Sequence, residues 1–166
     1  SIAADIVPIV GENRVLSFFG LKQLNSNPRN GLKALMEVSN RKDTFNISDV
    51  VFGIAPRINA AGRIEHGNKA VELLIQSDFA QAKVKAEYID KHNHTRRELD
   101  QSITQEALEM IVPNDKSTVV CSDNWHKGVV GIVASRLIES HYRPTIVLTE
   151  SNGKLTGSAR SVKGFD

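Results

Sequence analysis

The feature of the sequence that limits the fold most is a helical pattern of unusual length, which runs from Asp78 to about Ile111. Apolar side chains recur there at steps of three or four residues, with one gap where Asn93 and Arg96 stand. About 34 helical residues span about 50 Å, because each residue adds about 1.5 Å. We therefore expect one long helix that joins two lobes and ends before Pro113. Its apolar positions are Phe79, Ala82, Ala86, Ile89, Leu99, Ile103, Ala107 and Met110.

Shorter helical patterns precede the long helix. Residues 12–25 show one, and a shorter amphipathic pattern follows at residues 32–38. A third helix is predicted over residues 49–55, with Ser48 as its N-cap and Pro56 as the residue that ends it. The part of the chain before the long helix is therefore predicted to be a mainly helical lobe.

Three strands and one helix are predicted after the long helix. A Ser-Asn-Gly turn separates the last two strands, and the helix separates the first two. A strand–helix–strand order favours a right-handed crossover and a parallel pair. The expected strands cover residues 118–122, 144–150 and 154–160, and the expected helix covers residues 128–140. The fold class is thus predicted to be α/β, with the chain divided into residues 1–77, 78–112 and 113–166.

Composition excludes several classes of protein. The formal net charge is +2, so any phosphate site must come from local clustering of basic residues. The single cysteine, Cys121, excludes an internal disulfide and a multi-cysteine zinc site. No apolar run approaches the roughly 18 residues of a membrane helix, and no signal peptide is visible. An apolar run begins directly after Ser1, and residues 163–166 do not resemble a natural tail, so we expect both ends to be cuts inside a longer protein.

Asp5 is the first candidate for chemistry. It stands among apolar residues, where a charged carboxylate needs a partner if it is buried. A divalent cation is one such partner, since hard cations prefer carboxylate oxygen. The alternative is an aspartate that caps a helix or a turn.

Residues 55–63 carry a second candidate site. Arg57, Asn59 and Arg63 supply hydrogen-bond donors around small residues that would let a backbone approach closely. Guanidinium groups match phosphate oxygens in a bidentate manner, which predicts a phosphate site. The alternative is a tight loop with solvated arginines.

The α/β region offers two further phosphate candidates. His126 and Lys127 stand beside Gly128, where the predicted helix begins, and free N–H groups at a helix start favour an anion. Ser158 and Arg160 are two residues apart on a predicted strand, so both side chains should leave the same face. A hydroxyl and a guanidinium side by side could grip a terminal phosphate. Alternatively, these are ordinary polar residues at the surface.

The middle of the long helix is polar but does not form a zinc motif. His92 and His94 are two residues apart and so do not share a helix face. A polar patch that faces a groove, or plain exposure to solvent, explains them better. The sequence contains no GxSxG, HExxH, Walker loop or CxxC.

Taken together, five segments in order resemble the RecJ family of the DHH phosphoesterase superfamily. Residues 4–14 resemble its fourth metal motif, and residues 55–63 resemble its PRxNAAGR loop. Asn93 with Arg97 is similar to the N…R pattern of its connecting helix. Residues 125–137 are similar to its WHxGVVGIVASRL segment, and residues 157–161 to the GSxRS motif of the DHH-associated domain. The five matches span nearly all of the chain.

This resemblance implies an exonuclease that degrades single-stranded DNA from its 5′ end with two Mn²⁺ or Mg²⁺ ions, in DNA recombination and repair. It implies a monomer in the bacterial cytoplasm, with no membrane partner. Asp5 would be a catalytic metal ligand. Residues 1–77 would be the C-terminal part of a DHH catalytic domain, and residues 113–166 the N-terminal part of a DHH-associated, substrate-binding domain. Residues 78–112 would be the long helix that connects the two domains. The side chains that would hold phosphates are Arg57, Asn59, Arg63, His126, Ser158 and Arg160.

Three expectations remain open at this point. The family's Asp-His-His triplet does not occur here, so most metal ligands should lie before Ser1. Another DHH phosphoesterase, such as a nano-RNase, a cyclic-dinucleotide phosphodiesterase or a pyrophosphatase, is an alternative, although such enzymes tend to carry a glycine-rich GGGH-type motif where this chain has residues 157–161. A nucleic-acid-binding module without hydrolysis is the non-enzymatic alternative.

Overall fold

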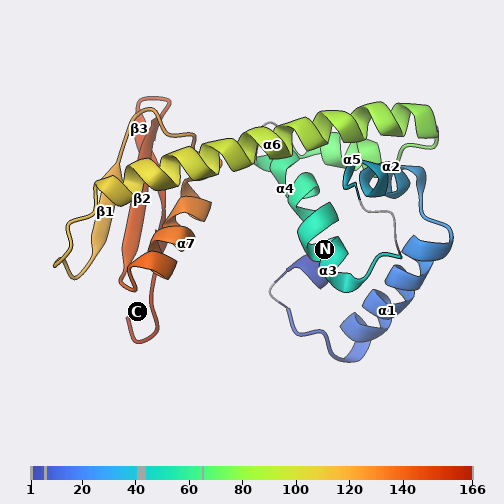
Figure 1. Ribbon diagram of the computed structural model, residues 1–166, viewed down its shortest axis with the longest axis horizontal. Coiled ribbons are helices and arrows are strands. Elements are labelled where there is room, and N and C mark those ends of the chain that lie inside the picture. Colours follow the sequence, from blue (N-terminus) through green and yellow to red (C-terminus); the bar gives the residue numbers. More distant parts are fainter. Residues whose placement is uncertain (1, 6, 41–43, 65, 166) are drawn as a thin grey trace. The chain divides into compact units, whose positions relative to one another are not determined.

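A computed structural model describes residues 2–5, 7–40, 44–64 and 66–165. The chain divides into two compact units, Ser1–His94 and Thr95–Asp166, which we call unit 1 and unit 2. The division falls inside helix α6 (Phe79–Glu109), so that the first half of this helix belongs to unit 1 and the second half to unit 2 (Figure 1). None of the described helices is long and apolar enough to cross a membrane.

Helix α6 confirms the long helical pattern, with 31 residues in one continuous helix. It begins after Asp78, whose Oδ1 accepts a hydrogen bond from the backbone N–H of Ala80 at 2.9 Å, as an N-terminal cap does. Its buried face departs from the expected one near its end. Met110 lies outside the helix and is 46% exposed, whereas Asp100 is 1% exposed. Asp100 can be buried because the Arg136 Nη2 group donates to its Oδ2 at 2.8 Å.

Unit 1 is helical, as the short patterns predict. Its buried core brings together side chains from α1, α2, α4, α5 and the first half of α6. The largest of the fully buried ones are Leu35, Leu73 and Ile89. The elements before α6 are a 3₁₀ turn (Ile2–Ala4), α1 (Gly11–Ser26), α2 (Asn30–Val38), α3 (Ile47–Asp49), a π-helical segment (Val50–Ile54), α4 (Ala55–Ile64) and α5 (Asn68–Leu74).

The prediction for the third helix was wrong at both ends. Asn46, rather than Ser48, is the N-cap: its side chain accepts from the Asp49 N–H, and the Asp49 carboxylate accepts from the Asn46 N–H. Pro56 does not end the helix, because the chain continues through the π-helical segment into α4. Pro56 is the second residue of α4 and follows directly on the π-helical segment, where the usual i→i−4 ladder is already interrupted because the Ala55 N–H donates to the Val50 carbonyl, five residues back.

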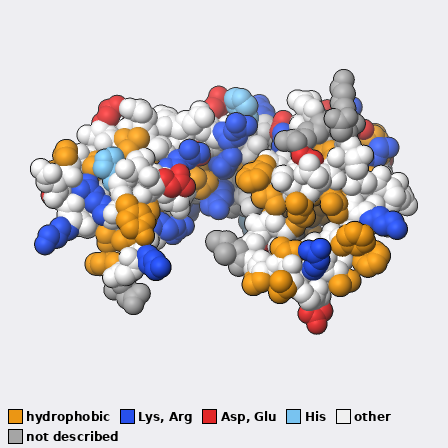
Figure 2. Space-filling model, turned by 60° about the horizontal axis from the view of Figure 1, so that its bottom comes forward, with side chains coloured by type: hydrophobic (Ala, Val, Ile, Leu, Met, Phe, Trp, Pro, Cys, Tyr) orange, Lys and Arg blue, Asp and Glu red, His pale blue; other side chains and the backbone are white. Residues whose placement is uncertain are grey.

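Helix α1 leaves much of its apolar surface open. Only Leu24 of this helix is buried, whereas Phe18 is 64% and Phe19 60% exposed, and their rings meet edge to face at 5.3 Å. Figure 2 shows hydrophobic side chains gathered on the surface of unit 1. A cavity of about 420 Å³ lies against α1, with a mainly apolar lining that includes Leu21 and Ile58. Unit 1 therefore carries more apolar surface than its own helices cover.

Unit 2 contains a three-stranded sheet in the order β1 (Thr118–Cys121), β2 (Thr145–Ser151), β3 (Lys154–Arg160). The predicted parallel pair is confirmed, because β1 and β2 run in parallel with Thr118 opposite Thr145. Strand β3 returns antiparallel through Asn152 and Gly153, both with positive φ, which suits a tight hairpin turn. Helix α7 (Val130–Ser140) packs on the sheet with Val133 and Leu137 buried (Figure 1).

Candidate phosphate-binding site

Ser158 and Arg160 lie on one face of β3, as their spacing predicts. They stand opposite Val147 and Thr145 of β2, whose side chains are buried. The Arg160 Nη1 group donates to Ser158 Oγ at 2.8 Å and to the Ala159 carbonyl at 2.8 Å. The hydroxyl and the guanidinium are therefore in direct contact, and Arg160 remains exposed to solvent.

Strand β3 can place this pair only because Gly157 precedes it. A Cβ on Gly157 would lie 2.2 Å from the Val147 carbonyl oxygen and 2.6 Å from Leu148 Cδ2. No side chain fits in that space, so glycine lets β3 approach β2 closely at this point. The glycine of the predicted segment 157–161 thus fixes the position of the two polar side chains that follow it.

The pair lies against the start of α7. A Cβ on Gly131, the second residue of α7, would lie 3.3 Å from Ser158 Oγ and 3.4 Å from Arg160 Nη2. The N-cap residue, Val129, makes no side-chain cap hydrogen bond to the first N–H groups of the helix. The Ile132 N–H already donates to the Val129 carbonyl at 2.8 Å, so the groups that favour an anion are the N–H groups of Val130 and Gly131, which have no acceptor among the described residues. A hydroxyl, a guanidinium and a helix start therefore converge on one place.

Two residues of α7 that the sequence did not single out also belong to this place. Gly131 lies beneath the pair, and Ser135 Oγ accepts from Arg160 Nε at 3.2 Å. They are four residues apart and so share one face of α7. That spacing is visible in the sequence, but it does not reveal which strand packs against the face.

His126 lies in the loop that leads into α7. Its Nδ1 accepts from the Gly128 N–H at 3.0 Å, and the ring is half-buried. When Nδ1 accepts, the neutral ring carries its proton on Nε2, which is then a donor. His126 can therefore donate to an anion near the helix start.

Trp125 holds this loop in place. It is buried, its Nε1 donates to Glu106 Oε2 at 2.9 Å, and its carbonyl accepts from Thr149 Oγ1 at 2.6 Å. The loop is thus attached to α6 through Glu106 and to β2 through Thr149. Neither of these two residues is recognisable from the sequence, because the contacts join segments 19 and 24 residues apart.

The three predicted phosphate ligands of unit 1 do not converge. Residues 55–63 were expected to form a loop, which was wrong, because they lie in α4. Asn59 and Arg63 are four residues apart and both exposed, so they share one helix face, whereas Arg57 faces elsewhere. Ala60 and Ala61 are buried in the protein rather than open to a ligand.

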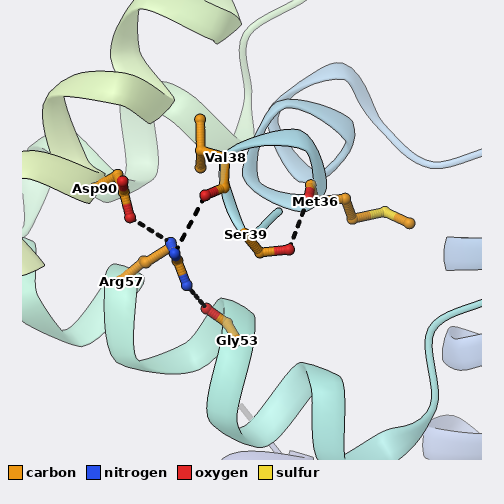
Figure 3. Close-up of polar contacts among 6 residues, drawn as sticks. All are labelled: Met36, Val38, Ser39, Gly53, Arg57 and Asp90. Atoms are coloured by element: carbon orange, nitrogen blue, oxygen red, sulfur yellow. Dashed lines mark hydrogen bonds and ion pairs between the residues drawn. The ribbon is translucent and has the colours of Figure 1, made fainter. Parts of the chain in front are cut away.

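Arg57 is held by three acceptors within unit 1 (Figure 3). Its Nε donates to Asp90 Oδ1 at 2.7 Å, its Nη1 to the Gly53 carbonyl at 2.6 Å and its Nη2 to the Val38 carbonyl at 3.3 Å. The Arg57 side chain is only 15% exposed. The guanidinium thus joins α2, the π-helical segment and α6. These bonds give Arg57 a structural role, which differs from the phosphate contact that the sequence predicts.

Asp5 is exposed in a bend after the first 3₁₀ turn, and its backbone carbonyl accepts from the Val7 N–H. Within the described ranges, no group of three or more His, Cys, Asp or Glu side chains could hold a metal ion. A carboxylate such as that of Asp5 can supply one oxygen ligand to a divalent cation, but the described residues do not complete a metal site around it.

A shifted pKa occurs away from these positions. The hydrogen bond that Lys85 donates to Glu72, together with the charges of Lys69 and Lys85, lowers the pKa of the Glu72 carboxyl below its ordinary value. Exposed ion pairs of this kind contribute little to stability. We assign this pair no part in the candidate site.

Comparison with protein families places a DHHA1 domain over residues 114–166. This range covers the sheet of unit 2, α7 and the Ser158–Arg160 pair. The candidate phosphate site therefore lies inside a domain of known family.

Known proteins resemble the chain over nearly its whole length. It is 42% identical to the single-stranded-DNA-specific exonuclease RecJ of Bacillus subtilis (strain 168), over 98% of this chain and 22% of that protein. It is 37% identical to the exonuclease of the same name from Escherichia coli (strain K12), over 98% of this chain and 30% of that protein. The chain thus spans less than a third of these curated relatives.

Solved structures agree with the sequence comparison. A crystal structure of exonuclease RecJ bound to manganese matches with a TM-score of 0.86 and 34% identity, over 97% of this chain and 40% of that one. The structure of RecJ in complex with Mg²⁺ from Thermus thermophilus matches with a TM-score of 0.88 and 33% identity, over 98% of this chain and 25% of that one. The chain is therefore a homologue of one segment of the RecJ single-stranded-DNA-specific exonucleases, and this segment includes a DHHA1 domain.

Proposed function

We propose that the chain is part of a metal-dependent 5′→3′ exonuclease that acts on single-stranded DNA, and that its DHHA1 domain holds the phosphate at the 5′ end. RecJ relatives that match 98% of the chain support the exonuclease. In this proposal residues 1–77 are the C-terminal part of the DHH catalytic domain, and residues 113–166 are the N-terminal part of the substrate-binding domain. Residues 78–112 are the long helix that connects the two domains. The enzyme acts as a monomer in recombination and repair in the bacterial cytoplasm.

The observation that carries the phosphate assignment is the contact of Ser158 and Arg160 beside the start of α7. Arg160 supplies a fixed positive charge, Ser158 a hydroxyl, and the helix start the N–H groups of Val130 and Gly131. All three favour an anion of compact shape. A terminal phosphate carries more negative charge than an internal diester. Arg160, Ser158 and the start of α7 should therefore bind a 5′-terminal phosphate more strongly than an internal one.

These contacts position a strand without reading its sequence. Ser158, Arg160 and His126 would contact phosphate oxygens, and phosphate contacts carry no information about the bases. Asn59 and Arg63, which share an exposed face of α4, would contact the backbone in the same way. An exonuclease that removes every nucleotide in turn requires recognition of this kind.

We further propose Mn²⁺ or Mg²⁺ as the cofactor, with Asp5 as one ligand. The solved RecJ structures that resemble this chain contain one or other of these ions. A pair of such ions in a nuclease activates water and stabilises the charge that develops on the phosphoryl group. Because the described residues of this chain offer Asp5 and no complete ligand set, we derive no catalytic step from them.

The test of the phosphate assignment compares 5′-phosphorylated and 5′-hydroxyl single strands at one salt concentration. Arg160→Ala should weaken binding of the phosphorylated strand about 10- to 100-fold, the equivalent of one hydrogen bond to a charged group. The 5′-hydroxyl strand should be affected less. Lys154→Ala, which removes a charge from the far end of β3, is the matched control. Equal losses on both strands would place Arg160 on an internal phosphate, and no loss would place it outside the site.

A second candidate is a nucleic-acid-binding module without hydrolysis. The absence of a three-ligand metal cluster among the described residues favours it for the 166-residue chain taken alone. Release of labelled nucleotides from 5′-labelled single strands distinguishes the two functions, because a binding module retains the strand intact.

A further inference from the structure

We propose that Gly131 and Ser135 of α7 determine the preference for a terminal phosphate: Ser135 orients the Arg160 guanidinium, and Gly131, which has no Cβ, lets Ser158 and Arg160 lie close against the helix. This inference rests on the proposed phosphate site. It assigns the two residues a positioning role, because they act through Arg160 and Ser158.

Ser135 is the middle member of a chain of hydrogen bonds. Its hydroxyl donates to the Gly131 carbonyl at 3.2 Å and accepts from Arg160 Nε at 3.2 Å. A serine hydroxyl has one proton. When that proton is directed to the carbonyl, a lone pair is left for Arg160, so the direction of the chain is fixed. Hydrogen bonds in such a chain strengthen one another.

The contacts leave one edge of the Arg160 guanidinium available. Nε is held by Ser135, and Nη1 is held by Ser158 and the Ala159 carbonyl. Among the residues that the structure describes, Nη2 has no acceptor. Nη2 is also the nitrogen that lies nearest to Gly131. Nη2 therefore lies beside the start of α7, and its two N–H groups can donate to the proposed phosphate there.

Orientation matters because Arg160 is exposed. A solvated arginine side chain populates many rotamers. A ligand that binds only one of these rotamers binds more weakly, because ordering the side chain costs conformational entropy. Ser135 and Ser158 hold the guanidinium from two sides before a ligand arrives. Removal of the Ser135 hydroxyl should therefore weaken phosphate binding although Ser135 itself does not contact the phosphate.

Gly131 acts through space rather than through a hydrogen bond. A Cβ there would lie 3.3 Å from Ser158 Oγ, which is tighter than most Cβ contacts, and 3.4 Å from Arg160 Nη2, which is at the short end of ordinary contact. Ser158 and Arg160 are side chains of which Arg160 is exposed, so a shift of a few tenths of an ångström would accommodate the Cβ and the fold would survive. Alanine is also the better helix former. Gly131→Ala should thus keep or raise the melting temperature while it displaces the guanidinium, and no purely structural role predicts that combination.

The experiment measures binding of 5′-phosphorylated and 5′-hydroxyl oligothymidylate to the 166-residue chain, with the melting temperature of each variant. We expect the wild type to prefer the phosphorylated strand. Ser135→Ala and Gly131→Ala should each reduce this preference about three- to tenfold, the range of a single hydrogen bond. Ser135→Thr retains the hydroxyl and should keep the preference within about twofold of the wild type. Ser140→Ala is the matched control, because Ser140 makes the same bond to the carbonyl four residues earlier without contact to Arg160.

The outcomes separate this inference from the proposed function. A wild-type chain without any preference would overturn both. A wild-type preference that persists in Ser135→Ala and Gly131→Ala would overturn the inference and leave the phosphate site in place. Equal losses on both strands, accompanied by a lower melting temperature, would show a structural role and would also overturn the inference.

Discussion

Arg57 was predicted from the sequence to bind phosphate, but in the structure its guanidinium donates to three acceptors inside the protein. A substitution of Arg57 therefore tests whether its main role is structural. Its guanidinium joins the last residue of α2, Val38, to Gly53 of the π-helical segment and to Asp90 of α6. A helix C-terminus favours a positive charge, so the Val38 carbonyl is a suitable acceptor. We predict that Arg57→Ala destabilises unit 1 whether or not DNA is present.

The expected magnitude follows from the three bonds. A hydrogen bond to a charged group contributes about 1.5–3 kcal/mol, and such contributions are not additive within one network. Asp90 is 39% exposed and regains water when Arg57 is truncated, which reduces the penalty. We therefore expect Arg57→Ala to lower the free energy of unfolding by about 2–4 kcal/mol. Arg57→Lys retains the charge but not the planar fork, and should lose roughly half as much.

Urea unfolding followed by circular dichroism gives the stability, and hydrogen exchange locates the change. Amide protection should fall across α2 and α4. Trp125, the only tryptophan of the chain, lies in unit 2, so its fluorescence serves as an internal reference. Asp90→Asn is the matched variant, because it keeps an acceptor oxygen for Arg57 Nε and should be milder than Arg57→Ala.

Two results would contradict this reasoning. If Arg57→Ala unfolds within about 0.5 kcal/mol of the wild type, as ordinary surface substitutions do, the three bonds do not stabilise unit 1. If the same variant also loses affinity for single-stranded DNA, its main role is the phosphate contact that the sequence predicted.

Three further predictions concern the metal ligand, the chain itself and the sheet. In a full-length RecJ-type enzyme that carries this chain, Asp5→Ala should abolish turnover with Mn²⁺ and leave DNA binding largely intact; near-normal release of nucleotides would make Asp5 structural. The purified 166-residue chain should release no nucleotides from single-stranded DNA with Mn²⁺, and measurable digestion would show a metal site that its described residues do not form. Gly157→Ala should destabilise unit 2 by about 1–3 kcal/mol in urea, followed by Trp125 fluorescence, because a Cβ would overlap the Val147 carbonyl. Gly20→Ala, which meets open space in α1, is its control and should be neutral or stabilising.

Elements whose signal is local could be predicted well. The period of the apolar residues identified α6 to within two residues at either end, and β3 has the predicted bounds, 154–160. The Asn152-Gly153 turn carries its own conformational signal, since both residues have positive φ. The same-face prediction for Ser158 and Arg160 was confirmed for the same reason, because it depends only on the period of a strand.

Elements whose outcome depends on distant contacts could not be predicted. Pro56 was expected to end a helix, yet the chain continues through a π-helical segment, which no local rule predicts. The acceptor of Arg57 on α6 is 33 residues away in the sequence, and Ser135 lies 25 residues before Arg160. Buried Asp100 is explained only by Arg136, which is 36 residues away. Sequence periodicity reports which face of an element is apolar, but it does not identify what packs against that face.

The contrast between Arg57 and Arg160 shows what the structure adds to a list of basic residues. Both were predicted to bind phosphate on residue type and neighbours alone. Arg57 is paired with a carboxylate, so its charge is largely compensated within the protein. Arg160 is held by two hydroxyls and a carbonyl, and no described carboxylate lies within ion-pair distance of it. Neutral partners orient a guanidinium without cancelling its charge, so Arg160 keeps its attraction for an anion. This difference in partners is why we place the terminal phosphate beside Arg160.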